Sequence, residues 1–340
     1  MSEFRALLRA LVARRDLERE QVAGAIGAIV DGEWSAIQSS AFLAALASKG
    51  ETSDEVVGAA EALRARALRV EHDLPLVVDT CGTGGDGAQT INVSTAAAFV
   101  LAGCGLPVAK HGNRAASSAC GSADVLEAAG LAIDASPEDA RRTLEREHFA
   151  FLFAQRYHPA TREVAPIRRE LGIRTVFNVL GPLANPAGAT HQVVGVASLA
   201  HLELVGQALA ALGGRAAAVV HASSGIDEVA GDVPTHVFEF GPGGTRRRLL
   251  DPADYGIAAP PGALAGGSPA HNAAALRAIL AGERSPRADV VALNAALALC
   301  VAERAEGLAE GLALARASLA SGAALAVFER MRRDSPVESA

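Results

Sequence analysis

Residues 79–122 read DTCGTGGDGAQTINVSTAAAFVLAGCGLPVAKHGNRAASSACGS, and the rest of the chain is organised around this stretch. The apolar run Leu74–Val78 before it predicts a short buried strand. The glycine-rich turn Gly82–Gly87 follows, and the small residues Ser94–Gly103 predict a helix. Glycines let the backbone approach a ligand closely, and the free amides at a helix N-terminus attract anions. This order of elements therefore predicts an anion-binding site.

A second polar loop, Lys110–Ser118, supports the same interpretation. Of the 31 lysine and arginine residues, only Lys49 and Lys110 are lysine. A compact ammonium group suits a phosphate oxygen where a planar guanidinium would not fit. A glycine-rich loop alone would be consistent with an ordinary turn. Two polar loops separated by one helix, with a rare lysine, favour a phosphate site.

Length and composition limit the class of protein. The 340 residues are enough for one large domain and a smaller one. The net charge of −7 argues against nucleic acid or an anionic membrane as the main partner. No apolar run reaches the length of a membrane span, and charges interrupt the first residues, so no signal-peptide pattern is present. The four cysteines show no metal-ligand spacing, and we expect a cytoplasmic protein.

The first part of the chain is predicted to be helical. Apolar residues recur at helical spacing from Phe4 to Leu11, and no strand pattern occurs before Leu74. Further helices are predicted from near Glu18, from near Ser35, and from a cap at Ser53–Glu55 to about Arg69. These helices predict a small all-helical N-terminal domain.

Strands and helices alternate in the remainder. The predicted strands are Phe149–Ala154, Val193–Val196 and Ala216–Val220, with a hairpin of Val237–Phe240 and Arg246–Leu250 around Gly241–Gly244. The predicted helices are Ser122–Gly130, one from Ser136, Leu199–Leu212, Asn272–Leu280, Val290–Glu303 and Leu308–Met331. A helical crossing segment spans residues 160–185, and Gly181–Pro186 is predicted to be a loop. This alternation is typical of an α/β fold.

The motifs GTGGD, NVST, KHGNRAASS and GSADVLEAAG resemble those of the anthranilate phosphoribosyltransferase family, and the resemblance runs nearly end to end. It implies a nucleoside-phosphorylase-like fold. Residues 1–72 would form the helical domain, completed by the crossing segment at about 165–185. Residues 73–164 and 186–340 would form an α/β domain with a central, mostly parallel sheet. The resemblance also implies a homodimer through the helical domain. From the net charge and the apolar runs we expect neither a nucleic-acid nor a membrane partner.

The implied reaction transfers the 5-phosphoribosyl group of phosphoribosyl diphosphate to the amine of anthranilate, in tryptophan biosynthesis. The resemblance assigns donor binding to Gly82, Gly85, Asp86, Thr90, Asn92, Val93, Ser94, Thr95, Lys110, Asn113, Ser117, Ser118 and Ser122. Asp86 would repel phosphate by itself, so we expect it to organise the loop or a metal-bound water.

The pair Asp227–Glu228 follows a strand and a glycine. Adjacent carboxylates can bind Mg²⁺, which prefers oxygen ligands, although an ordinary solvated pair would show the same pattern. The resemblance places Mg²⁺ on Ser94, Asp227 and Glu228, where it would bridge the diphosphate of the donor.

Arg168 lies on the crossing segment, where its guanidinium could pair bidentately with the carboxylate of anthranilate. Arg169 beside it is expected to be a surface residue. The resemblance implies acceptor contacts from Gly82, Asn113, Arg168, His111, Tyr157, His158 and Pro182, with Asn113 at the amine.

No nucleophile–base pair is evident, and none is required, because the aromatic amine of anthranilate is neutral and already nucleophilic. Positioning of the substrates and stabilisation of the leaving diphosphate would supply the catalysis, without a catalytic acid or base and with Lys110 supporting the leaving group. Two alternatives remain. One is a pyrimidine nucleoside phosphorylase of the same fold. The other is a non-enzymatic nucleic-acid-binding homologue, which would need a basic groove beyond the short run Arg246–Arg248.

Overall fold

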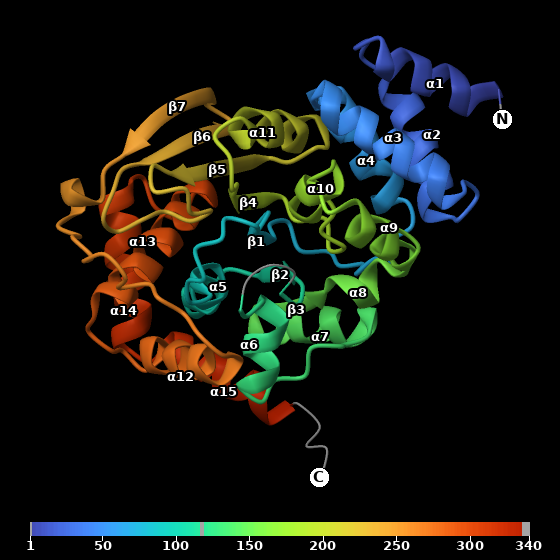
Figure 1. The fold of residues 1–340 in the computed structure, drawn as a ribbon. Helices are drawn as coiled ribbons and strands as arrows, with labels where there is room; N and C mark the ends of the chain where they lie inside the picture. The colour runs from blue at the N-terminus through green and yellow to red at the C-terminus, as the bar shows by residue number, and fades with distance from the viewer. Residues whose placement is uncertain (1, 116–118, 335–340) are drawn as a thin grey trace.

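The computed structural model describes residues 2–115 and 119–334, and it shows a central sheet with helices on both faces (Figure 1). The strands are β1 (Val78–Gly82), β2 (Val108–Gly112), β3 (Phe149–Phe153), β4 (His191–Gly195), β5 (Ala216–Ala222), β6 (Thr235–Gly241) and β7 (Gly244–Leu250). Their order is β3-β2-β1-β4-β5-β6-β7, with the first five parallel. β6 and β7 are antiparallel, which confirms the predicted hairpin.

The first strand differs from its prediction. Leu74–Val78 was expected to be the strand, but β1 begins at Val78 and pairs with β4 residue by residue as far as Gly82. The polar residues Asp79 and Thr80 therefore lie inside the strand, and both are buried. They are tolerated there because Asp79 Oδ2 accepts a hydrogen bond from a buried asparagine and Thr80 Oγ1 donates one to a helix carbonyl.

The first four helices of the chain form a group beside the sheet (Figure 1). They are α1 (Ser2–Val12), α2 (Arg19–Val30), α3 (Ala36–Lys49) and α4 (Ser53–Arg64). α4 is capped by Thr52 rather than by Ser53, because the Thr52 side chain accepts the amide of Glu55 and the Glu55 carboxylate accepts the amide of Thr52. α4 ends at Arg64, five residues before the predicted end at Arg69.

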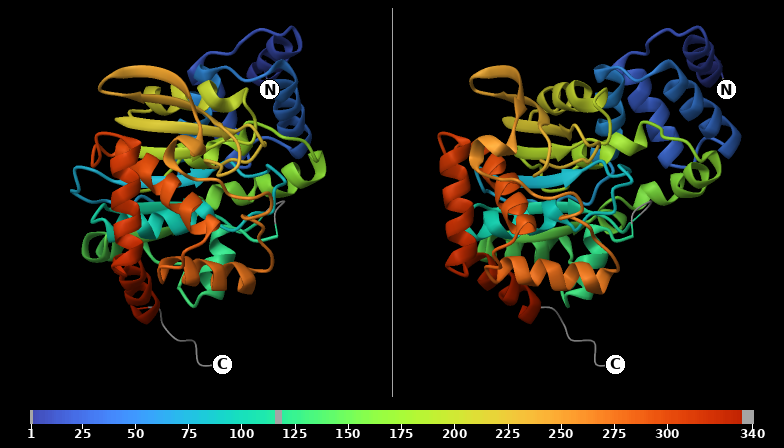
Figure 2. Two further views of the ribbon diagram at one scale, coloured as in Figure 1. Left: turned by 90° about the vertical axis from the view of Figure 1, so that its left-hand side faces the viewer. Right: turned by 60° about the vertical axis from the view of Figure 1, so that its left-hand side comes forward.

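One face of the sheet is covered by two helices from the first half of the chain and four from its end (Figure 2). They are α5 (Val93–Gly103), α6 (Ser122–Ala128), α12 (Pro269–Leu280), α13 (Pro286–Val301), α14 (Leu308–Ala320) and α15 (Ala323–Asp334). α5 is buried over nearly its whole length and contacts α13, α14 and α15. The single helix predicted at Leu308–Met331 is instead α14 and α15, because the chain turns at Gly322, where φ is +77°.

The opposite face carries α7 (Pro137–Glu147), α8 (Ala154–Tyr157), α10 (Phe177–Leu183) and α11 (His201–Ala211). Its main hydrophobic core is continuous with the core of the four N-terminal helices. Short 3-10 helices occupy Pro159–Arg162 and Pro252–Tyr255. The division into domains at 1–72, 73–164 and 186–340 remains a prediction.

The crossing segment contains α9 (Val164–Leu171) and α10. α9 packs on α3, and α10 packs on α4 and on the ends of β1 and β2. Gly181 and Pro182 were predicted to be loop residues, but they form the last turn of α10. A proline at this position costs the helix the one backbone hydrogen bond that an N–H at residue 182 would donate to the carbonyl four residues earlier.

In the described part of the chain, no single helix has the length and apolar character that crossing a membrane requires. The bent pair Leu308–Ala320 and Ala323–Arg333 meets that requirement by length and composition alone.

Candidate functional site

A cleft of about 370 Å³ opens at the carboxyl ends of β1 and β2. β1 and β4 are neighbours, while the chain continues from β1 to β2 on the other side, so the strand order reverses here. Open α/β sheets bind ligands at this reversal point. The predicted site residues that line the cleft are Gly82, Gly85, Asp86, Thr90, Asn92, Ser94, Thr95, Lys110, His111, Asn113, Ser122, Arg168, Pro182, Asp227 and Glu228.

Among the described residues, Val93, Tyr157 and His158 were predicted to belong to the site but do not line the cleft. Ser117 and Ser118 are outside the described residues. Val93, the first residue of α5, is fully buried and does not line the cleft. Tyr157 was predicted to wall the acceptor site, and this placement is wrong. β3 continues directly into α8, which turns Tyr157 into the core, where its hydroxyl donates to Ala135 O at 2.9 Å.

The loop after β1, residues 83–87, is called here the donor loop. The amide of Gly84 donates to Asp227 Oδ2 at 2.8 Å, so the loop is fastened to the carboxylate pair. Asp86 accepts the amides of Ala88 and Asp227 at 3.1 and 3.4 Å, which supports its predicted role in organising the loop. A Cβ on Gly195 would stand 1.5 Å from the carbonyl oxygen of Asp227, so only glycine fits at the end of β4.

Asn92 precedes α5 and is held by two other parts of the chain. Its Nδ2 donates to Cys120 O at 3.1 Å, and its Oδ1 accepts from Asn272 Nδ2 at 3.0 Å. Asn272 lies on α12 and is buried, and it also accepts the amide of Gly267 at 2.9 Å. Sequence reasoning missed Asn272, whose only signal was an amide within an alanine-rich helix.

Lys110 is almost completely buried at the end of β2. Its ammonium group donates to Thr80 O and, at 3.4 Å, to Ser94 Oγ, so it sits between β1 and the N-terminus of α5. The Lys49 side chain is only 4% exposed, with its ammonium group 2.8 Å from Glu55 and 2.7 Å from Asp16. The rarity of lysine therefore indicates buried ammonium groups in general, not phosphate binding in particular.

Asp227 and Glu228 meet the N-terminus of α5, where the amide of Ser94 donates to Glu228 Oε1 at 3.0 Å. Burial raises the pKa of Asp227, and the charge of Asp86 raises it further. Burial also raises the pKa of Glu228, with the charge of Asp227 as the next cause. The ionised form of both carboxyl groups is thus destabilised, and a bound cation would stabilise it.

These oxygen ligands fit Mg²⁺. In the described residues, no cluster of three or more His, Cys, Asp or Glu side chains could hold a metal by itself. Mg²⁺ commonly binds through one or two carboxylates and completes its shell with substrate phosphates and water. Asp227, Glu228 and the hydroxyl of Ser94 therefore suit an ion that arrives with a phosphorylated ligand.

Residues 164–183, which contain α9 and α10, are called here the acceptor segment. The Arg168 guanidinium lies 5.7 Å from the centre of the Phe177 ring, and burial lowers its pKa. Within the described residues, Arg168 has no carboxylate partner, although it lines the cleft. Arg169 is exposed, as predicted. Phe177 and Asn178 also line the cleft, and sequence reasoning missed both.

His111 and His158 form a buried pair with ring centres 5.1 Å apart. His111 Nδ1 lies 3.0 Å from Gly181 O, and a carbonyl only accepts, so Nδ1 carries the proton. Burial lowers the pKa of His111 to about 3 and that of His158 to about 4. Both rings are therefore neutral at pH 7. His111 lines the cleft, whereas His158 does not.

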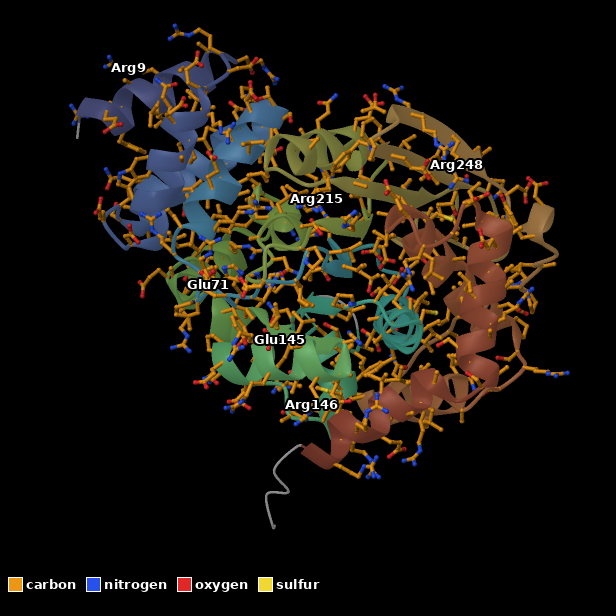
Figure 3. All side chains as sticks on the ribbon, turned by 180° about the vertical axis from the view of Figure 1, so that it is seen from behind. Arg9, Glu71, Glu145, Arg146, Arg215 and Arg248 are labelled. Carbon is orange, nitrogen blue, oxygen red and sulfur yellow. The ribbon has the colours of Figure 1, made fainter. Side chains whose placement is uncertain are left out.

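The basic run Arg246–Arg248 is paired with carboxylates. Arg246 and Arg248 both contact Glu239, and Arg247 contacts Glu203. Figure 3 shows Arg248 on β7, at the outer edge of the sheet. A nucleic-acid-binding protein would need unpaired basic side chains, and the three arginines of this run are instead paired with carboxylates.

Comparison with protein families gives two matches. Residues 74–325 match the family described as "Glycosyl transferase family, a/b domain". Residues 5–67 match the family described as "Glycosyl transferase family, helical bundle domain". The first match covers the part of the chain that forms the sheet and its helices, and the second covers the four N-terminal helices.

Individual proteins are similar over almost the whole chain. The anthranilate phosphoribosyltransferase of Chloroflexus aggregans is 51% identical over 331 residues, which are 96% of this chain and 97% of that protein. That of Thermomicrobium roseum is 49% identical over 332 residues, 96% of this chain and 95% of that protein. The crystal structure of the Thermus thermophilus enzyme superposes with a TM-score of 0.90 at 43% identity, covering 96% of this chain and 98% of the other. The structure of the Saccharomyces cerevisiae enzyme in complex with PRPP and Mg superposes with a TM-score of 0.89 at 28% identity. This match covers 98% of this chain and 97% of the other.

Proposed function

The chain belongs to the anthranilate phosphoribosyltransferase family, and we propose that it performs this family's reaction with the residues that line its cleft. It is an enzyme that transfers the 5-phosphoribosyl group of phosphoribosyl diphosphate to the amine of anthranilate, giving N-(5-phosphoribosyl)anthranilate and diphosphate, in tryptophan biosynthesis. One observation supports the residue assignment most strongly. A single cleft brings together three features: groups that can donate hydrogen bonds to phosphate, a carboxylate pair, and an arginine without a carboxylate partner among the described residues.

The donor is proposed to lie between the donor loop and the N-terminus of α5. Residues of both elements line the cleft, and the ammonium group of Lys110 donates to Ser94 Oγ at 3.4 Å. Backbone amides and a fixed ammonium group stabilise the charge that develops on a departing diphosphate, and they need no reorganisation during the reaction. The proposed donor residues in the cleft are Gly82, Gly85, Asp86, Thr90, Asn92, Ser94, Thr95, Lys110, Asn113 and Ser122. Ser117 and Ser118 are proposed from the sequence resemblance alone.

Asp227, Glu228 and Ser94 are proposed to hold Mg²⁺, as the relative with bound PRPP and Mg suggests. When bound, Mg²⁺ would supply positive charge to the diphosphate of the donor. The chain's own part is to keep both carboxylates in position, which the amides of Gly84 and Ser94 do by donating one hydrogen bond to each.

Anthranilate is proposed to lie beside the acceptor segment, with its carboxylate on Arg168 and its ring near His111 and Pro182. Arg168 rests on the Phe177 ring, which limits the positions its guanidinium can take. Asn113 would face the amine, and its side-chain oxygen already accepts from Gln155 Nε2 at 3.3 Å. The amine is neutral at pH 7, so the residues orient it toward the ribose and need not remove its proton first.

A fluorescence assay tests the proposal. Anthranilate should be consumed only when phosphoribosyl diphosphate and Mg²⁺ are both present. A second assay with a pyrimidine nucleoside and inorganic phosphate tests the same-fold alternative, and it should give no turnover. Turnover in the second assay and none in the first would replace the proposed function with that alternative.

We also propose a homodimer formed through the N-terminal helices. Val12 on α1 and Ile37 on α3 expose 73% and 83% of their surface, which is unusual for large apolar residues. Light scattering should give twice the mass of the chain, and Ile37→Glu should weaken the dimer. An unchanged dimer in this variant would exclude Ile37 from the interface.

A cytoplasmic location is proposed as well. All four cysteines are free thiols, as is usual in a reducing compartment. Cell fractionation would test this location.

A further inference from the structure

Arg174 connects the acceptor segment to the donor loop. It lies between α9 and α10, and its Nη1 donates to Gly85 O at 3.3 Å. Gly85 has a φ of +78°, and a Cβ built on it would stand 2.4 Å from Nη1. The guanidinium therefore packs directly on the backbone of Gly85. Arg174 is exposed and does not line the cleft, so it contacts the loop from outside the cleft.

The part of the acceptor segment that carries Arg174 is firmly held. Thr175, Val176 and Phe177 follow it and are buried, and the amide of Thr175 donates to Asn178 Oδ1 at 3.0 Å. The far end of α10 is bonded to two strands, because Gly181 O contacts His111 on β2 and Pro182 O accepts from Gln192 on β4 at 2.8 Å. The backbone from which the Arg174 side chain extends to the donor loop is thus held in place.

The contact continues on both sides toward the proposed substrate positions. On the donor side, Gly84 next to Gly85 is bonded to Asp227 of the carboxylate pair. On the acceptor side, Phe177 lies under the Arg168 guanidinium. Three residues after Arg174 the segment reaches this ring, and one residue before Gly85 the loop reaches the carboxylate pair. Arg174 is therefore a direct protein link between the two halves of the cleft.

We propose that Arg174 is a positioning residue that couples the two substrates, so that binding of either one strengthens binding of the other. The proposal rests on the proposed function of the cleft. A ligand that fixes the position of the donor loop also fixes the exposed Arg174 side chain against Gly85 O, so this side chain and its loop partner are already ordered when the second ligand binds. Because binding free energies are linked, the effect is the same in both directions.

Calorimetry with a non-reacting pair of ligands tests the proposal. Inorganic diphosphate with Mg²⁺ fills the leaving-group part of the donor site and cannot transfer a ribosyl group to anthranilate. In the wild-type enzyme, saturating magnesium diphosphate should lower the dissociation constant of anthranilate about fivefold or more, the low end of typical coupling between sites. In Arg174→Ala this ratio should fall to about one, while anthranilate alone should bind nearly as in the wild type.

Arg169→Ala is the matched control, because Arg169 is exposed on the same segment and has no hydrogen bond or ion pair within the described residues. It should keep the wild-type ratio. A ratio near one in the wild type, or an equal ratio in Arg174→Ala and the wild type, would overturn the coupling. If the wild type neither binds anthranilate nor turns it over, the proposed function fails instead, and the two failures are thus distinguishable.

Discussion

Replacing Arg168 by alanine should weaken anthranilate binding and leave the donor largely unaffected. The Arg168 guanidinium is partly buried, rests on the Phe177 ring, and has no carboxylate partner in the described residues. An incoming carboxylate would therefore displace no existing ion pair, so most of the new interaction should appear as affinity. A hydrogen bond to a charged group contributes about 1.5–3 kcal/mol. At about 1.4 kcal/mol for each factor of ten, the KM for anthranilate should rise roughly ten- to hundredfold.

The assay is initial-rate kinetics with anthranilate varied at saturating phosphoribosyl diphosphate and Mg²⁺. Donor affinity is measured separately by calorimetry and should change less than about threefold, because about 0.6 kcal/mol is within the effect of an ordinary surface change. Arg169→Ala is the control and should be nearly silent in both measurements, since Arg169 is exposed. An unchanged KM in Arg168→Ala, or a large increase in Arg169→Ala, would refute the acceptor assignment.

Two further predictions concern the donor half. Lys110→Arg adds volume at an almost completely buried site, so it should lower stability by about 1–3 kcal/mol and raise the KM for phosphoribosyl diphosphate. The control Lys49→Arg should lower stability only. Equal KM values for phosphoribosyl diphosphate in the two variants would contradict this prediction. Asp227→Asn with Glu228→Gln should abolish Mg²⁺-dependent turnover. Because burial raises the pKa of both carboxyl groups in the folded state, their ionisation weakens folding as pH rises above their ordinary values near 4. The double variant should therefore melt at a higher temperature than the wild type at pH 7 with a chelator present, and the difference should vanish near pH 3–4; a lower melting temperature at pH 7 would contradict the burial argument.

The sequence predicted those parts of the site that depend on neighbouring residues. The donor loop, the helix after it and Lys110 occur within one short stretch, and local glycine and strand signals are sufficient to place them. The carboxylate pair was predicted from its place on the loop after a strand together with the family resemblance. These residues line one cleft because the ends of parallel strands meet at one edge of the sheet.

The remaining features depend on contacts between distant segments, for which the sequence carries no local signal. Asn272 reaches Asn92 across 180 positions, and Arg174 reaches Gly85 across 89. Tyr157 was misplaced because a strand that continues into a helical turn has the same apolar pattern as one that ends in a loop. The boundaries of β1 were misjudged because its polar residues are satisfied by partners far away in the chain.

The nearly complete burial of α5 has a consequence for synthesis of the protein on the ribosome. α5 ends at Gly103, and α13, the longest of the helices that cover it, begins at Pro286. A nascent chain grows at about 5–20 residues per second, so this apolar helix emerges roughly ten to forty seconds before its cover has been translated. During that interval its surface is a target for chaperones and for aggregation. Truncated chains that end before α13 should therefore accumulate in inclusion bodies, although they already contain the whole glycine loop and Lys110.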